Sequence, residues 1–251
     1  MFAEPFSEII FFIFVGFAAQ LVDGAIGMAY GLIGSLTLIS FGIPPATASA
    51  SIHAAEVFTT GASGLSHWRF KNIDFSLVKR LVPAGMAGGF IGAFILAEYA
   101  STTLSLIIAF YLFIMGGVVL RRGFGKFSII KKKARYLAPL GFVGGLLDAI
   151  GGGGWGPLVN SNLIGQGTNP RISIGSTSLA EFFVATTISS TFFFTIGLSL
   201  WPIITGLVIG GVIAAPFAAL AAKKLPTKIL MVIVGLAIMV LSARVILTTA
   251  L

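Results

Sequence analysis

Four of the eight carboxylates in this 251-residue chain lie inside apolar stretches, and they form two pairs with the same spacing. Asp23 precedes Glu56 by 33 residues, and Asp148 precedes Glu181 by the same interval. A charge in the hydrocarbon core of a membrane costs at least about 2.5–3.5 kcal/mol, so intramembrane acids usually face a cavity, an ion path or a partner. The repeated spacing predicts one functional element that the chain uses twice.

The composition excludes a soluble domain with a solvated surface. Hydrophobic residues make up 57% of the chain and charged residues 10%, and the mean hydropathy is +1.03. We therefore expect a polytopic, all-α membrane protein. With no cysteine, disulfides and thiolate-bound metals are excluded. The net charge of +8 fits a basic cytoplasmic loop better than nucleic-acid binding, because seven Lys and Arg residues fall between positions 121 and 135.

Apolar runs bounded by polar or Pro/Gly turns predict ten helical segments. The runs are 6–22, 26–42, 46–67, 77–97, 103–120, 137–149, 153–165, 171–197, 201–222 and 228–247. Most of them are long enough to cross a bilayer, which takes about 17–25 residues in a helix. The runs 137–149 and 153–165 are too short, so we expect them to be half-helices.

The two halves of the chain repeat each other. Residues 16–60 align without gaps on residues 141–185, at an offset of 125. The identities include Asp23/Asp148, Gly27/Gly152, Pro45/Pro170, Ser51/Ser176 and Glu56/Glu181; farther along, an offset of 122 places Arg122 on Arg244. We therefore predict an N-terminal repeat at 1–122, a basic cytoplasmic linker at 123–135 and a C-terminal repeat at 136–251.

The number of segments sets the relative orientation of the repeats. With five segments in each half, the second half starts from the opposite side of the membrane, so the repeats are inverted. A cytoplasmic linker then leaves both termini outside. It also makes two further basic loops cytoplasmic, as the positive-inside rule requires. These loops carry Arg69, Lys71, Lys79 and Arg80 in the first half and Lys223, Lys224 and Lys228 in the second.

Glycine-rich breaks follow both aspartates, which predicts Gly-broken helical hairpins at the first two segments of each repeat. Inverted repeats with such breaks are typical of secondary transporters, whose site lies at the membrane midplane. A helix that begins after each break would present free N–H groups, which favour anions. The predicted substrate-binding residues are Gly24, Gly27, Ser51, Gly151, Gly152, Gly153, Gly154, Trp155, Ser176 and Thr177. The alternative is that the glycines allow close helix packing and the hydroxyls bond within their own helices.

His53 lies three residues before Glu56, hence on the same helical face, and could share a proton with it. A packing or hydrogen-bonding role is the alternative. The residues predicted to couple transport to protons are Asp23, His53, Glu56, Asp148 and Glu181.

Several motifs together make this chain similar to the sulfite exporter TauE/SafE family, also described as the toluene-sulfonate uptake permease family. In the first half they are residues 23–28, 44–47, 51–56 and 67–74; in the second half they are residues 151–154 and 170–176. The resemblance covers nearly the full chain. It implies transport of a small sulfur-containing or organic anion, such as sulfite or a sulfonate, across the bacterial cytoplasmic membrane.

Four acids repel an anion, so the resemblance and the charges must be reconciled. Burial disfavours the charged form of a carboxyl group, and a protonated acid can donate a hydrogen bond to an anion. We therefore predict a proton-coupled anion transporter that works by rocking of the two halves, with no cofactor, resident metal or enzymatic activity. Its partners are the small anion, protons and the lipid bilayer.

Three other classes stay open from the residues alone. A carrier of sodium or a divalent metal could use the four acids as ligands, and an anion channel would share the same sequence cues. An intramembrane enzyme could use Asp23 and Asp148 as a dyad, but the glycine-x-glycine-aspartate signature of such proteases is missing.

Overall fold

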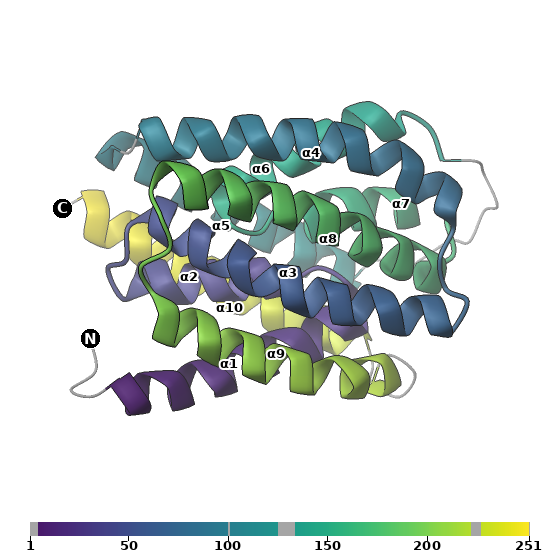
Figure 1. The fold of residues 1–251 in the computed structure, drawn as a ribbon, viewed down its shortest axis with the longest axis horizontal. Helices are drawn as coiled ribbons and strands as arrows, with labels where there is room; N and C mark the ends of the chain where they lie inside the picture. The colour runs from purple at the N-terminus through teal and green to yellow at the C-terminus, as the bar shows by residue number, and fades with distance from the viewer. Residues whose placement is uncertain (1–4, 100, 125–133, 222–226, 251) are drawn as a thin grey trace.

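The computed structural model describes residues 5–99, 101–124, 134–221 and 227–250, and every element in these ranges is helical (Figure 1). This confirms the all-α prediction. The first half contains α1 (Pro5–Ile26), α2 (Tyr30–Ser40), α3 (Pro45–Arg69), α4 (Phe75–Glu98) and α5 (Thr102–Phe124). The second half contains α6 (Leu137–Gly151), the π-helical turn η1 (Gly156–Asn160), α7 (Ser161–Gly165), α8 (Pro170–Thr195), α9 (Trp201–Ala221) and α10 (Thr227–Ala250).

The helix boundaries follow the predicted runs except at α2. The run 26–42 seemed long enough to cross a bilayer, but α2 has only 11 residues. Glycines in the left-handed conformation bound it on both sides, because Gly27 has φ +68° and Gly42 has φ +84°. Only glycine adopts this conformation without strain, so the helix cannot extend through either position. Short second segments therefore occur in both halves, and not in the second half alone.

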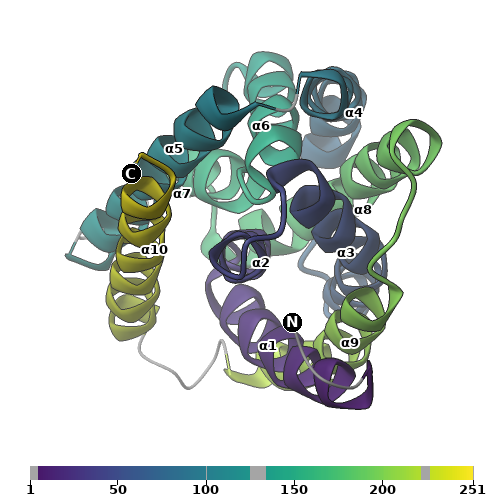
Figure 2. The ribbon, with the colours of Figure 1, turned by 90° about the vertical axis from the view of Figure 1, so that its left-hand side faces the viewer.

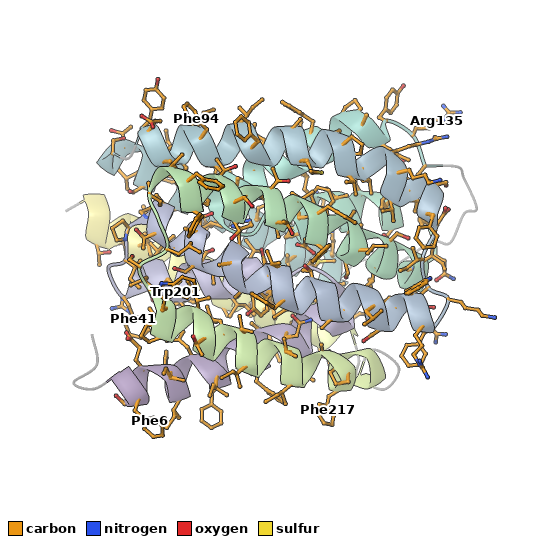
Figure 3. The ribbon with its side chains drawn as sticks, in the orientation of Figure 1. Phe6, Phe41, Phe94, Arg135, Trp201 and Phe217 are labelled. Atoms are coloured by element: carbon orange, nitrogen blue, oxygen red, sulfur yellow. The ribbon has the colours of Figure 1, made fainter. Side chains whose placement is uncertain are left out.

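Among the described residues, five helices are long and apolar enough to span a membrane. These segments are Phe6–Gly24, Phe75–Glu98, Thr103–Phe124, Trp201–Ala218 and Met231–Thr248. Exposed aromatic side chains such as Phe6, Phe94 and Phe217 point away from the bundle, as lipid-facing side chains do (Figure 3). The protein is therefore a multi-pass membrane protein by length and composition.

The two polar long helices, α3 and α8, form one side of the bundle (Figures 1 and 2). They contain 25 and 26 residues, long enough to cross a bilayer, but they carry many hydroxyl side chains. They pack against each other, and Figure 1 shows them between α4 and α9. Most of their hydroxyl side chains are buried against other helices, which is where polar groups are tolerated inside a membrane.

Helices of the first half pair with helices of the second half. The most extensive helix pairs join α1 to α9, α4 to α6 and α5 to α10. Glycines allow the first two pairs to approach closely. A methyl group added at Gly210 would overlap the carbonyl oxygen of Ile13, and one added at Gly88 would overlap that of Phe142. Small residues at helix contacts favour association where lipid provides no hydrophobic driving force.

The bundle has two distinct ends. Both described chain ends lie on one side, together with Phe6, Phe41 and Trp201; we call this the terminal end (Figures 1 and 3). Arg135 lies on the opposite side, which we call the linker end. Figure 2, which faces the terminal end, shows α2 near the middle of the longer helices. Several basic residues of the predicted cytoplasmic loops lie outside the described residues, namely Lys126, Lys131, Lys132, Lys133, Lys223 and Lys224.

The α4–α6 contact provides a test of this packing. We expect Gly88→Val to lower the free energy of unfolding by about 1–3 kcal/mol, because the new side chain meets backbone that cannot move aside. The matched control is Gly117→Val on α5, where an added methyl group would meet no described atom within 4 Å. Thermal unfolding in detergent measures both, and equal midpoints for the two variants would contradict the proposed contact.

Candidate functional site

Each half begins with a helix that breaks at a glycine. In the first half the amide of Gly27 donates to the carbonyl oxygen of Asp23, and α2 begins at Tyr30. In the second half the amide of Gly152 donates to the carbonyl oxygen of Asp148 at 2.7 Å, and Gly152 has φ +64°. The two left-handed glycines are 125 residues apart, so the aligned sequences form the same turn.

The two aspartates cap the segments that follow these turns. Asp23 Oδ1 accepts hydrogen bonds from the amides of Ala29, at 2.8 Å, and Tyr30, at 3.3 Å. Asp148 Oδ1 accepts from the amides of Gly154, at 2.7 Å, and Trp155, at 2.9 Å. Sequence reasoning offered these N–H groups to an anionic substrate. In this structure the amides donate to the side chains of Asp23 and Asp148, so each break is capped by a carboxyl group of the protein itself.

Each turn is also held by the opposite half. The hydroxyl of Ser35 donates to the carbonyl oxygen of Gly152 at 2.6 Å. The side-chain amide of Asn160 donates from Nδ2 to the carbonyl oxygens of Gly27, at 3.0 Å, and Ile26, at 3.2 Å. Ser35 and Asn160 again lie 125 residues apart. Sequence analysis missed this pair because the residue types differ, although their shared offset was a usable signal.

All four intramembrane carboxylates line one small cavity between the two turns. Its other lining residues are Met28, Ala29, Tyr30, Gly31, Leu32, Gly153, Gly156 and Pro157. The cavity has a volume of about 10 Å³, which is room for roughly one water molecule. Five pairs of lining residues correspond at the 125-residue offset, including Glu56 with Glu181 and Gly31 with Gly156. The predicted acid pairs therefore meet at one place.

His53 joins two of these acids. Its Nε2 lies 3.4 Å from Asp148 Oδ2 and 3.7 Å from Glu56 Oε2. The three side chains are at most 2% exposed. Glu56 Oε2 has no hydrogen-bond partner in the described parts of the chain. On its other side, His53 Nδ1 lies 2.8 Å from the carbonyl oxygen of Ser49. That oxygen is only an acceptor, so we assign a proton to Nδ1 and leave Nε2 facing the acids.

The predicted substrate-binding residues separate into three groups. Gly153 lines the cavity, whereas Gly27, Gly152 and Gly154 shape the turns beside it. Gly24 packs against Ala218 and Gly151 against Tyr111, so these two glycines make helix contacts.

The predicted hydroxyl residues lie away from the lining of the cavity. Ser51 donates to the carbonyl oxygen of Thr47, and Thr177 donates to that of Ser173, each within its own helix. Ser176 accepts from the amide of Asp74 at 2.9 Å, which fixes the loop between α3 and α4. Within the described structure, these three hydroxyls therefore serve the alternative role of hydrogen bonds to the backbone.

Trp155 anchors the second turn to α8. Its side chain is fully buried, and its indole Nε1 donates to the carbonyl oxygen of Thr177 at 3.2 Å. A methyl group added at Gly85 would overlap the indole ring, so α4 approaches the ring closely. Trp155 therefore positions the broken helix and is not among the residues that line the cavity.

The capping role of the aspartates can be separated from their charge. We expect Asp148→Ala to destabilise the protein by about 1–3 kcal/mol, because two buried amides lose their acceptor. Asp148→Asn keeps an oxygen at this position and should unfold close to the wild-type temperature. Thermal unfolding in detergent compares the two variants, and the same ordering is expected at Asp23. Equal stability of the alanine and asparagine variants would rule out a cap.

Comparisons with known proteins identify the family of the chain. The chain matches the family described as "Sulfite exporter TauE/SafE" over residues 12–245. It is 39% identical over 246 residues to the "Probable membrane transporter protein YtnM" of Bacillus subtilis (strain 168), covering 94% of this chain and 82% of that relative. No solved structure matches the chain. The protein is a membrane transporter and not an enzyme, and it belongs to the sulfite exporter TauE/SafE family.

Proposed function

We propose that this transporter carries a small sulfur-containing or organic anion, of the sulfite and sulfonate class, and couples its movement to protons by alternating access. The observation that carries the proposal is the meeting of four carboxylates at one small cavity, where His53 contacts the two that are buried, Glu56 and Asp148. The family description names sulfite export, which supports the anion class.

The geometry around His53 supports proton coupling. With the Nδ1 proton directed at Ser49, His53 exchanges protons only through Nε2. The oxygens of Glu56 and Asp148 that face Nε2 lie at distances over which a small shift creates a hydrogen bond. A proton can therefore pass between the imidazole and either acid without crossing solvent. Protonation removes negative charge from the cavity and leaves O–H or N–H donors in its place.

The size of the cavity supports a carrier over an open pore. A volume of about 10 Å³ does not admit an anion of four heavy atoms such as sulfite. The anion would enter when the turns separate toward one end of the bundle. Glu56 and Glu181 would then be protonated, because an anion and two charged carboxylates repel one another.

We further propose that the two halves are inverted repeats with re-entrant hairpins. The exchanged helix pairs, the matched left-handed glycines and the reciprocal bonds of Ser35 and Asn160 support a two-fold relation between the halves. In the bacterial cytoplasmic membrane, the linker end would face the cytoplasm and both termini would lie outside. The exposed basic residues Arg69, Lys71, Lys79 and Arg80 around the α3–α4 loop support this orientation.

Flux measurements test proton coupling. In proteoliposomes, we expect sulfite uptake by the wild type to increase when a pH gradient is imposed. Glu56→Gln and Glu181→Gln should lose this response, because glutamine cannot exchange a proton. Glu98→Gln is the control, since Glu98 is exposed at the end of α4. Sulfite flux that ignores the gradient, in the wild type and in both cavity variants, would refute the proposal.

A cation carrier is the second candidate, and one observation favours it. His53, Glu56 and Asp148 each offer a ligand atom, and the three atoms lie within 4.8 Å of one another. One imidazole and two carboxylates suit zinc or manganese, and a metal-bound histidine usually donates its other N–H to a backbone carbonyl, as His53 does.

Metal analysis separates the two candidates. If the cation reading holds, purified protein should bind Zn²⁺ or Mn²⁺ with one site per chain, and His53→Gln should abolish binding. His67→Gln provides the control, because His67 lies at the end of α3. If the anion proposal holds, sulfite flux should persist after chelation and dialysis. Metal-dependent uptake without any sulfite flux would replace the anion proposal with the cation one.

A further inference from the structure

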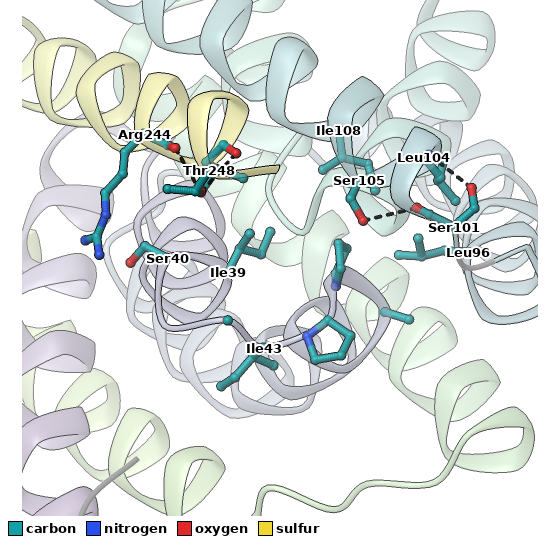
Figure 4. Close-up of a pocket in the computed structure, with 15 residues that line it drawn as sticks. Ile39, Ser40, Ile43, Leu96, Ser101, Leu104, Ser105, Ile108, Arg244 and Thr248 are labelled. Carbon is teal, nitrogen blue, oxygen red and sulfur yellow. Dashed lines mark hydrogen bonds between the residues drawn. The ribbon is translucent and has the colours of Figure 1, made fainter. Parts of the chain in front are cut away.

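A larger pocket opens at the terminal end of the bundle, apart from the small cavity. It has a volume of about 670 Å³ and lies between the α2–α3 turn, the α4–α5 connection and the last turns of α10 (Figure 4). Its lining includes Ser40, Pro44, Ser101, Ser105, Arg244 and Thr248. This space is large enough for a small anion together with water.

Arg244 is the one basic side chain at this end among the described residues. The other described lysines and arginines lie at the linker end, in the last turns of α3 and α5, in the loops, or at the starts of α4, α6, α8 and α10. If the linker end is cytoplasmic, Arg244 lies on the side where the positive-inside rule disfavours lysine and arginine. Arg244 therefore departs from the charge pattern of the whole chain.

The Arg244 guanidinium is also free to bind. Within the described structure, it has neither a hydrogen bond nor an ion pair, and the residue is exposed. The hydroxyls of Ser40, Ser105 and Thr248 donate to backbone carbonyls, so they offer only acceptors to the pocket. Figure 4 shows the guanidinium at the edge of the pocket, on the side away from Ser101 and Ser105, with a planar fork that matches the oxygens of an oxyanion.

The corresponding position in the first repeat behaves differently. Arg122, which aligns with Arg244 at the offset of 122, lies at the linker end and donates from Nη1 to the carbonyl oxygen of Ser161 at 2.6 Å. The same arginine position is thus engaged by the protein at one end and available at the other. This difference leaves Arg244, and not Arg122, able to bind a solute at its end of the bundle.

One face of α3 leads from the pocket to the small cavity. Ala46 lines the pocket, Ser49 lies one turn farther along, and His53 lies one turn beyond that. The hydroxyl of Ser49 donates to the carbonyl oxygen of Ala149 at 2.6 Å, which ties this face to the second turn. A solute at the mouth of the pocket is therefore separated from the acids by about two helical turns.

We propose that this pocket is a loading site, in which Arg244 binds a small oxyanion of the sulfite and sulfonate class before it reaches the cavity. The inference deepens the proposed function and rests on it. The phosphate of an anionic lipid headgroup offers the same chemistry as a free oxyanion, so the experiment must distinguish these two sources.

The chain has no cysteine, which allows binding to be measured at a single introduced thiol. Ser101→Cys places that thiol at the pocket, where a maleimide reagent can label it in nanodiscs of neutral lipid. We expect sulfoacetate or methanesulfonate to slow the labelling, and the added substitution Arg244→Gln to abolish this protection. Arg80→Gln, which removes an exposed arginine at the linker end, should leave the protection unchanged.

Transport gives the second measurement. In proteoliposomes, Arg244→Gln should raise the KM for sulfite about tenfold or more and change kcat little, because the arginine acts before the anion reaches the cavity. Arg80→Gln again serves as the control. A KM equal to that of the wild type, together with retained protection, overturns the loading site while leaving proton-coupled transport intact.

Two further outcomes would also overturn the inference. Protection by anionic phosphatidylglycerol in the nanodisc, without protection by any of the free anions, would assign the pocket to lipid. Absence of protection by every free anion in the wild-type background would show that the pocket binds none of them. If the wild type carries no sulfite at all, the proposed function itself fails, whatever the labelling shows.

Discussion

The structure depends on satisfying the backbone of two broken helices deep inside an apolar bundle. A helix that stops between two apolar layers leaves amides and carbonyls without partners, and each such group costs several kcal/mol in hydrocarbon. The protein meets this demand twice and in the same way. Asp23 and Asp148 accept from the amides of the next segment, while Ser35 and Asn160 donate to the glycine carbonyls of the opposite turn. Each half therefore supplies hydrogen bonds that complete the turn of the other.

This arrangement divides the four acids by chemistry. Each aspartate has one oxygen committed to two backbone amides, so its position is fixed. Glu56 has an oxygen that is free within the described structure and faces His53. The aspartates therefore hold the turns through one oxygen, and the second oxygen of Asp148 still faces His53. In the proposed mechanism the proton moves among His53, Glu56 and this second oxygen.

The sequence predicted the features that depend on spacing. The acid pairs, the glycine turns and nine of the helical segments follow from residue type and offset, because the repeat preserves both. Features that depend on how helices face one another were not accessible. Spacing could not show that Ser51 bonds within α3, that Ser176 fixes a loop, or that the cavity has room for only about one water molecule. The shortness of α2 was also not predicted, because the apolar run 26–42 includes Gly27 and Gly42, where the backbone leaves helical geometry.

The exchanged helix pairs limit which bodies can move against each other. The backbones of α1 and α9 are in close contact at Gly210, and those of α4 and α6 are in close contact at Gly88, with no side chain between them. This close packing favours each pair moving as one unit. Each pair joins the first helix of one repeat to the fourth helix of the other. Rocking of residues 1–122 against 136–251, which the sequence alone suggested, would separate both pairs, so these contacts favour a movement in which α1 stays with α9 and α4 stays with α6.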